Sequence, residues 1–143
     1  LNVQKYVLVK EDEGTLKVKI KKDVSLETNS PIKVFISTPL LKYLAIDGST
    51  EVNGNGVFSG ADEVKIKIAG SGKVKLDVNT PITQVEVAGS GDVMMGGQTR
   101  EHIIKIAGSG DIKSENLLAE KVKVKLAGSG NVRVHAADEL DIS

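Results

Sequence analysis

One tetrapeptide recurs at near-constant spacing through the second half of this chain. Its four identical copies, Ala-Gly-Ser-Gly, begin at Ala69, Ala88, Ala107 and Ala127, at intervals of 19, 19 and 20 residues. A degenerate copy, Asp47-Gly48-Ser49-Thr50, begins 22 residues before the first. A fixed period of this length is the signature of a repeat protein, because one such unit buries its apolar face only against its neighbours.

Aliphatic residues occupy alternating positions before each turn, and one more follows it. The pre-turn pairs are Ile66 and Ile68, Val85 and Val87, Ile104 and Ile106, and Val124 and Leu126; the post-turn residues are Val74, Val93, Ile112 and Val132. A period of two is typical of a strand with one buried face. Each unit therefore predicts a strand, a Gly-Ser-Gly turn, a second strand and a polar return, such as residues 79–81 or 96–99.

The repeat predicts an all-β fold, a single-stranded right-handed parallel β-helix with rungs of 19–20 residues. When rungs stack ~4.8 Å apart, equivalent side chains form columns, and the aliphatic columns become the core. The turn glycines are expected to supply positive φ at a corner where a Cβ would be costly. Hexapeptide helices, calcium-binding nonapeptide repeats and leucine-rich repeats fit less well, because this chain marks one corner in about 19 residues.

We expect a single solenoid domain over residues 1–143, with cap strands in residues 1–40 and repeat rungs in residues 41–143. In the cap, the apolar runs on either side of residues 11–15 predict a hairpin, and residues 31–36 predict a further strand.

The repeat stops before a further turn at its C-terminal end. Leu140 and Ile142 align with Val122 and Val124, but no Gly-Ser-Gly follows them. The last rung is therefore expected to be incomplete and to leave an open strand edge. Such an edge would allow a homo-oligomer to form.

Composition excludes several classes of function. Nineteen basic and nineteen acidic residues give a net charge of zero, so nucleic acid is not an expected partner. Without cysteine the chain has no disulfide, thiolate metal site or cysteine nucleophile. No apolar run approaches the ~20 residues that span a bilayer. The sequence starts at Leu1 without a signal-peptide pattern, as expected of a trimmed or mature form.

Two aspartates are candidates for a metal site. The residues after the turns align in one column, Glu51, Lys73, Asp92, Asp111 and Asn131, which sets Asp92 and Asp111 on neighbouring rungs about 5 Å apart. Two carboxylates at this spacing suit Ca²⁺ or the acid pair of a retaining glycosidase. The simpler interpretation is that Asp and Asn favour turns. We therefore expect no catalytic residue and no cofactor, and we keep Asp92 and Asp111 as calcium candidates.

The histidines and arginines stand alone in the sequence. His102 takes a pre-turn position matched by Val122 and is predicted to lie near a rung edge, whereas His135 is expected to face solvent. Neither has a second histidine or a cysteine at metal-ligand spacing. The turn serines have no nearby base, and no nucleophile elbow or phosphate loop surrounds them. A polysaccharide lyase would need a basic group beside its carboxylates, and Arg100 and Arg133 lie on different parts of the rung.

Basic side chains line both predicted outer faces. They are Lys65, Lys67, Lys105, Lys123 and Lys125 before the turn, and Lys75, Lys113 and Arg133 after it. Outward lysines of this kind keep stacked β-surfaces soluble and discourage edge pairing. The alternative is a surface for an anionic glycan or a lipid headgroup. Glu86, Asp92 and Glu115 interrupt such a patch.

The order of these segments resembles a family of bacterial proteins, common in Bacteroidetes, described as putative auto-transporter adhesin, head GIN domain. The resemblance rests on residues 14–18, 31–36 and 40–44 and on the four Gly-Ser-Gly-x-Val/Ile turns. It implies a β-solenoid and export to the periplasm or cell surface, and it carries over no catalytic residue. The degenerate turn at Asp47 and the absent final turn depart from the family pattern.

These features together favour a non-enzymatic adhesion or structural module that presents a rigid repeat surface to an envelope or host protein or glycan. Two other classes stay open: a polysaccharide-active β-helix enzyme of the pectin-lyase kind, and a lipid- or sugar-binding protein. An aromatic-lined groove or clustered acids would favour those alternatives.

Overall fold

The computed structural model describes residues 6–21 and 31–143, in two compact units, Leu1–Ser37 and Thr38–Ser143. In the first unit, β1 (Val7–Asp12) and β2 (Thr15–Ile20) pair as an antiparallel hairpin. Its two-residue turn has positive φ at both positions, 49° at Glu13 and 78° at Gly14, as the twist of a tight hairpin requires. The predicted hairpin is confirmed.

The strand predicted for residues 31–36 is absent from the structure, and this prediction was wrong. The alternation of Ile32, Val34 and Ile36 has the right period, but in the described part of the chain no strand pairs with this segment. An extended segment becomes a strand only when a neighbour completes its backbone hydrogen bonds. That the first unit caps the solenoid within a single domain stays a prediction.

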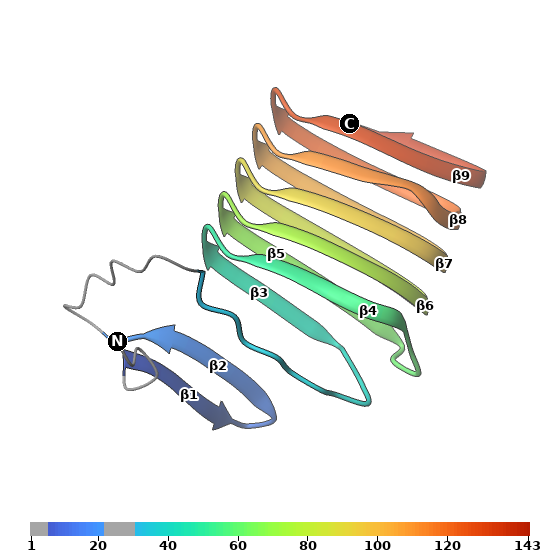
Figure 1. The fold of residues 1–143 in the computed structure, drawn as a ribbon. Helices are drawn as coiled ribbons and strands as arrows, with labels where there is room; N and C mark the ends of the chain where they lie inside the picture. Colours follow the sequence, from blue (N-terminus) through green and yellow to red (C-terminus); the bar gives the residue numbers. More distant parts are fainter. Residues whose placement is uncertain (1–5, 22–30) are drawn as a thin grey trace. The chain divides into compact units, whose positions relative to one another are not determined.

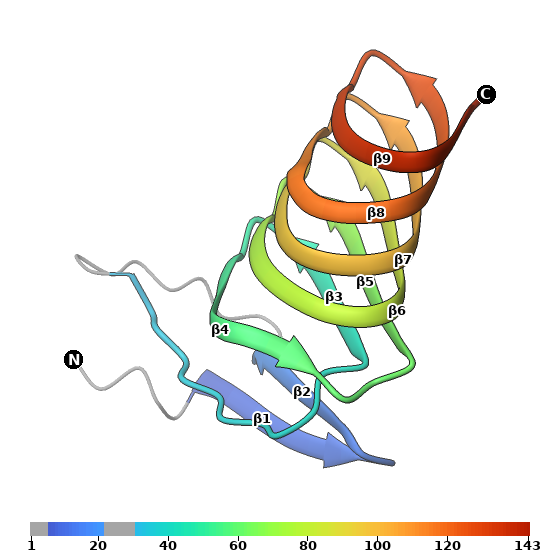
Figure 2. The same cartoon turned by 90° about the vertical axis from the view of Figure 1, so that its right-hand side faces the viewer.

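The second unit is a parallel β-solenoid, as the repeat predicted. Its strands are β3 (Tyr43–Gly48), β4 (Glu51–Ser59), β5 (Glu63–Gly70), β6 (Lys73–Gly89), β7 (Asp92–Gly108), β8 (Asp111–Gly128) and β9 (Asn131–Ile142). The order β3-β5-β6-β7-β8-β9 is parallel throughout, and β4 pairs with β6. Figure 1 shows the stacked rungs with their corners in one row, and Figure 2 shows the long strands β6–β9 curving round the stack.

Each complete rung is one long strand that runs from turn to turn. The polar segments expected to be returns belong to the parallel ladder, with Asn79 opposite Gln98 and Thr80 opposite Thr99. They pair because the rung above and the rung below offer a backbone partner to nearly every residue. The buried Thr99 hydroxyl shares its one hydrogen between the Pro81 carbonyl of the neighbouring rung, at 3.3 Å, and the Glu101 carbonyl of its own rung, at 3.2 Å.

The two glycines of each turn are needed for different reasons. The first has positive φ, 117° at Gly70 and 138° at Gly108, a conformation that disfavours a Cβ. The second has ordinary φ but no room: a Cβ on Gly91 would lie 2.6 Å from Ile68 Cγ2 and 3.1 Å from the Gly72 carbonyl oxygen. The corners therefore stack in direct backbone contact.

The core consists of the predicted aliphatic columns. One column runs through Ile66, Val85, Ile104 and Val124, each at most 4% exposed. In the described residues no further rung packs on the columns beyond β9, and Ile142 at their end is 65% exposed. The open edge predicted at the C-terminal end of the repeat is thus present, since β9 pairs in the described residues with β8 alone.

Candidate functional site

The turn serines stack as predicted, and backbone hydrogen bonds hold the stack together. The amide of each serine donates to the first glycine carbonyl of the preceding turn, at 2.9 Å for Ser71, Ser90, Ser109 and Ser129. A column of this kind stabilises the corner. The hydroxyls stand on an exposed edge beside no base that the structure describes, in keeping with a structural role.

The post-turn column places Asp92 opposite Asp111, as predicted. Asp111 Oδ1 accepts bonds from Asn131, at 2.9 Å from the side-chain amide and 3.2 Å from the backbone amide, and these bonds lower the pKa of Asp111. Asp92 lies 3.9 Å from the Lys73 ammonium. Each carboxylate thus faces a neighbour that stabilises its charge. In the parts that the structure describes, no three His, Cys, Asp or Glu side chains are grouped as metal ligands. Calcium binding at Asp92 and Asp111 stays a prediction.

A buried polar cluster lies inside the solenoid, and sequence reasoning missed it. His102 is 1% exposed rather than near a rung edge. Its Nδ1 lies 2.8 Å from Thr83 Oγ1 and its Nε2 lies 3.1 Å from Ser114 Oγ. Burial lowers the pKa of His102 to about 4, against the opposing effect of a bond to the Thr83 backbone. The ring is therefore neutral near pH 7, donating from one nitrogen and accepting at the other.

Ser114 and His102 lie within hydrogen-bond distance, as a catalytic nucleophile and its base do, but a substrate cannot reach them. Both residues are 1% exposed and face the core between aliphatic columns. A substrate would have to enter the stack of rungs to reach them. The cluster is therefore a group of buried polar side chains that satisfy one another's hydrogen bonds. The signal was in the sequence, because His102 and Ser114 both stand at inward positions that the next rung fills with valine, Val122 and Val134.

The other isolated residues lie at the surface. His135 is exposed, as predicted. Arg133 continues the post-turn column of Lys75, Met94 and Lys113, and Arg100 is exposed on β7. The two arginines do not meet a cluster of carboxylates in the described residues. Nor does the described chain contain a helix of the length and apolarity needed to cross a bilayer.

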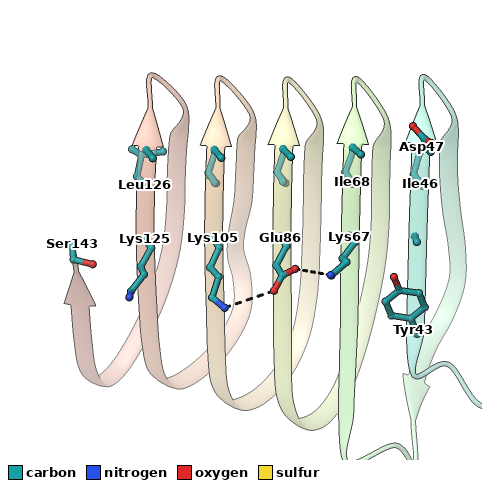
Figure 3. A pocket seen from close by; sticks show the side chains of 17 residues that line it. Tyr43, Ile46, Asp47, Lys67, Ile68, Glu86, Lys105, Lys125, Leu126 and Ser143 are labelled. Carbon is teal, nitrogen blue, oxygen red and sulfur yellow. Dashed lines mark ion pairs between the residues drawn. The ribbon is translucent and has the colours of Figure 1, made fainter.

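The outer face before the turn carries a shallow groove of about 910 Å³ across β3 and β5–β8. Its floor is the column next to the turn, where Ala69, Ala88, Ala107 and Ala127 lie in register and exposed. One wall is the neighbouring column of charged residues, labelled in Figure 3. They are Lys67, Glu86, Lys105 and Lys125. We call this surface the alanine groove.

The carboxylate of Glu86 forms ion pairs with lysines on both neighbouring rungs. Glu86 lies 3.2 Å from the ammonium groups of both Lys65 and Lys67 and 3.7 Å from that of Lys105, on three adjacent rungs. Burial acts to raise the pKa of Glu86, but the bonds from Lys67 and Lys65 outweigh it and lower the pKa. The wall is thus a cross-strand ion network that keeps its shape at neutral pH.

One comparison with known proteins gives a match. The model of the family described as putative auto-transporter adhesin, head GIN domain, matches residues 1–143, the whole chain. No curated protein and no solved structure matches it significantly. The family description names the head domain of an auto-transporter adhesin, in agreement with the resemblance found from the turn pattern.

Proposed function

Because the chain belongs to the auto-transporter adhesin, head GIN domain family, we propose that it is a non-enzymatic adhesion module that holds its partner on the outer face of the solenoid. The family description supports a location outside the cytoplasm. The proposed partner is a glycan or protein of the envelope or of a host surface.

The alanine groove is the observation that carries this proposal. It crosses successive rungs whose Cα positions are in register, so it repeats the same side chains along the solenoid axis. The rungs are held by continuous backbone ladders and by a core that needs no ligand for its formation. A rigid surface loses little entropy when a partner binds, which favours recognition of an extended ligand.

The chemistry of the described residues gives the competing enzymatic function less support. The Ser114–His102 pair is sealed in the core, and the half-buried Asp92 and Asp111 each have a neutralising or hydrogen-bonding neighbour. A polysaccharide lyase or glycosidase of this fold would need an exposed acid–base pair in a groove. The alanine groove has two acids, Asp47 and Glu86, which lie on β3 and β6, and three lysines hold Glu86 ionised.

A binding screen with the whole chain tests the proposal. We expect saturable binding to at least one ligand in a panel of purified glycans and envelope fractions, without ligand cleavage. Ala107→Leu, which fills the groove floor, should weaken that binding about tenfold, because it removes contact along the groove. Met94→Leu is the matched control, since Met94 is also exposed on β7 but lies on the post-turn face.

Two results would contradict the proposal. One is the absence of binding to every member of the panel. The other is the appearance of shortened polymer or unsaturated sugar products, which would establish an enzyme instead. Equal loss of binding in Ala107→Leu and Met94→Leu would move the site away from the alanine groove.

A further inference from the structure

The alanine groove has a surplus of positive charge on its wall. The wall carries the three ammonium groups of Lys67, Lys105 and Lys125 and the one carboxylate of Glu86, which also pairs with Lys65 beside the wall. Lys125 forms no ion pair with any residue that the structure describes, and it stands in register with Lys105 on the next rung. Adjacent like charges on paired strands repel each other, so an anion between Lys105 and Lys125 would relieve that repulsion.

On the outer face before the turn, the surplus of positive charge is confined to this wall. Farther from the turn on the same outer face, Lys123 lies 2.7 Å from Glu101 and Lys121 lies 3.0 Å from Glu139. Those lysines are already neutralised. At the β3 end of the groove, Asp47 occupies the floor column in place of an alanine. An anionic occupant is therefore directed toward the β7 and β8 end of the groove, which holds Lys105 and Lys125.

The shape of the floor selects an extended occupant. Each alanine projects a single carbon, and successive rungs stand ~4.8 Å apart, so the floor is a flat track along the solenoid axis. Neutral sugars usually bind on aromatic platforms, and the one aromatic residue lining the groove is Tyr43, at the end opposite Lys125. Of the large aliphatic residues that line the groove, Ile46, Ile68, Val87 and Ile106 are at most 6% exposed and Leu126 is 37% exposed, so the track offers little apolar surface to a bilayer.

We propose that the alanine groove binds a linear polysaccharide bearing carboxylate or sulfate groups, which lies along the alanine column with its anions at Lys105 and Lys125. This inference rests on the proposed adhesive function and names the class of ligand. Anionic charge provides the attraction, and the flat floor restricts the ligand to an unbranched chain.

The test measures binding of the whole chain to two immobilised probes, polygalacturonate for carboxylates and dextran sulfate for sulfates. Neutral dextran is the probe control. We expect binding to one or both anionic polymers that weakens as salt rises from 0.05 to 0.5 M, roughly as screening of exposed charges requires. Binding to dextran sulfate alone or polygalacturonate alone would identify which anion the groove prefers.

Paired lysine variants locate the site. Lys105→Gln/Lys125→Gln should reduce the affinity about tenfold, since two exposed ion pairs are lost. Lys75→Gln/Lys113→Gln makes the same change in net charge on the post-turn face and should reduce it less than about threefold. Circular dichroism and thermal unfolding of both variants check that the solenoid is intact.

Several outcomes would overturn the inference. They are equal losses in the two paired variants, no binding to either anionic polymer, and binding to phosphatidylglycerol vesicles that depends on Lys105 and Lys125 while polymer binding does not. A ligand from the glycan and envelope screen could keep its binding in Lys105→Gln/Lys125→Gln and lose it in Ala107→Leu. That result would rule out an anionic ligand and leave the adhesive function in place.

Discussion

At the residue scale, the corner of each rung depends on positions where a side chain cannot be accommodated. Gly108 combines a φ of 138° with a virtual Cβ that would overlap the Gly89 carbonyl oxygen. Gly56 also has positive φ, 80°, but a Cβ there would meet no atom within 4 Å. A substitution at Gly56 therefore tests the conformational cost of a Cβ alone. A substitution at Gly108 adds the cost of pushing two rungs apart.

Gly108→Ala is therefore predicted to destabilise the protein by more than about 3 kcal/mol, and Gly56→Ala by about 1 kcal/mol. The excess in Gly108→Ala comes from the close approach of the stacked corners. Urea unfolding followed by circular dichroism measures both free energies. Equal effects in the two variants would show that the corners do not stack as closely as described.

Protonation of the buried His102 is the second effect at this scale. Burial disfavours the charged ring and lowers the pKa of His102 from its ordinary 6.5 to about 4 in the folded chain. The neutral ring stabilises the fold fully above pH 6.5, and that contribution is lost as the pH falls toward 4. The loss amounts to on the order of 3 kcal/mol.

His102→Gln should remove this part of the pH dependence while keeping polar atoms between Thr83 and Ser114. We expect the free energy of unfolding of the native chain to fall more steeply from pH 6.5 to pH 4 than that of His102→Gln. His135→Gln, which changes the exposed histidine, should follow the native chain. Parallel curves for the native chain and His102→Gln would refute a neutral buried ring.

At the element scale, the position of a strand in the stack decides what an identical side chain contributes. Ile104 on β7 and Ile142 on β9 belong to the same core column. Ile104 is 0% exposed and Ile142 is 65% exposed. The rung above covers the first, and in the described residues no rung covers the second.

Ile104→Ala is predicted to cost roughly 2–5 kcal/mol, because it leaves a cavity in a filled column. Ile142→Ala should cost less than about 1 kcal/mol, because water already reaches most of that side chain. Chemical unfolding of the two variants compares them directly. A large loss in Ile142→Ala would mean that another chain or segment covers β9 in solution.

At the scale of the whole molecule, zero net charge and an open strand edge act together. The chain has nineteen basic and nineteen acidic residues, so long-range repulsion between copies is weak near pH 7. β9 presents the unpaired side of its backbone together with Leu140 and Ile142, which are 52% and 65% exposed. Such an edge is a template for pairing with another strand.

We therefore expect this chain to associate with itself as its concentration rises, as measured by sedimentation velocity. Leu140→Lys/Ile142→Lys should shift the distribution to the monomer, because two charges on the edge oppose stacking. Lys75→Gln/Lys105→Gln, on the outer faces of β6 and β7, is the control expected to leave association unchanged. A monomer at every concentration would contradict the prediction.

Much of this organisation could be predicted from particular residues. The spacing of Ala69, Ala88, Ala107 and Ala127 was enough to give the rungs, their register and the core columns, because a periodic chain has one way to stack its turns in line. The segment 31–36 shows the limit: its alternation is that of a strand, but pairing needs a partner elsewhere in the chain.

The sequence by itself determined the solenoid, since each turn specifies a corner and each alternating run specifies an inner face. The tertiary structure decided the rest. It turned His102 and Ser114 into a buried bonded pair, because a 20-residue rung brings the serine to face the ring. It also made four separate alanines into a groove floor beside Glu86 and its lysines, since a surface exists only once the rungs are stacked.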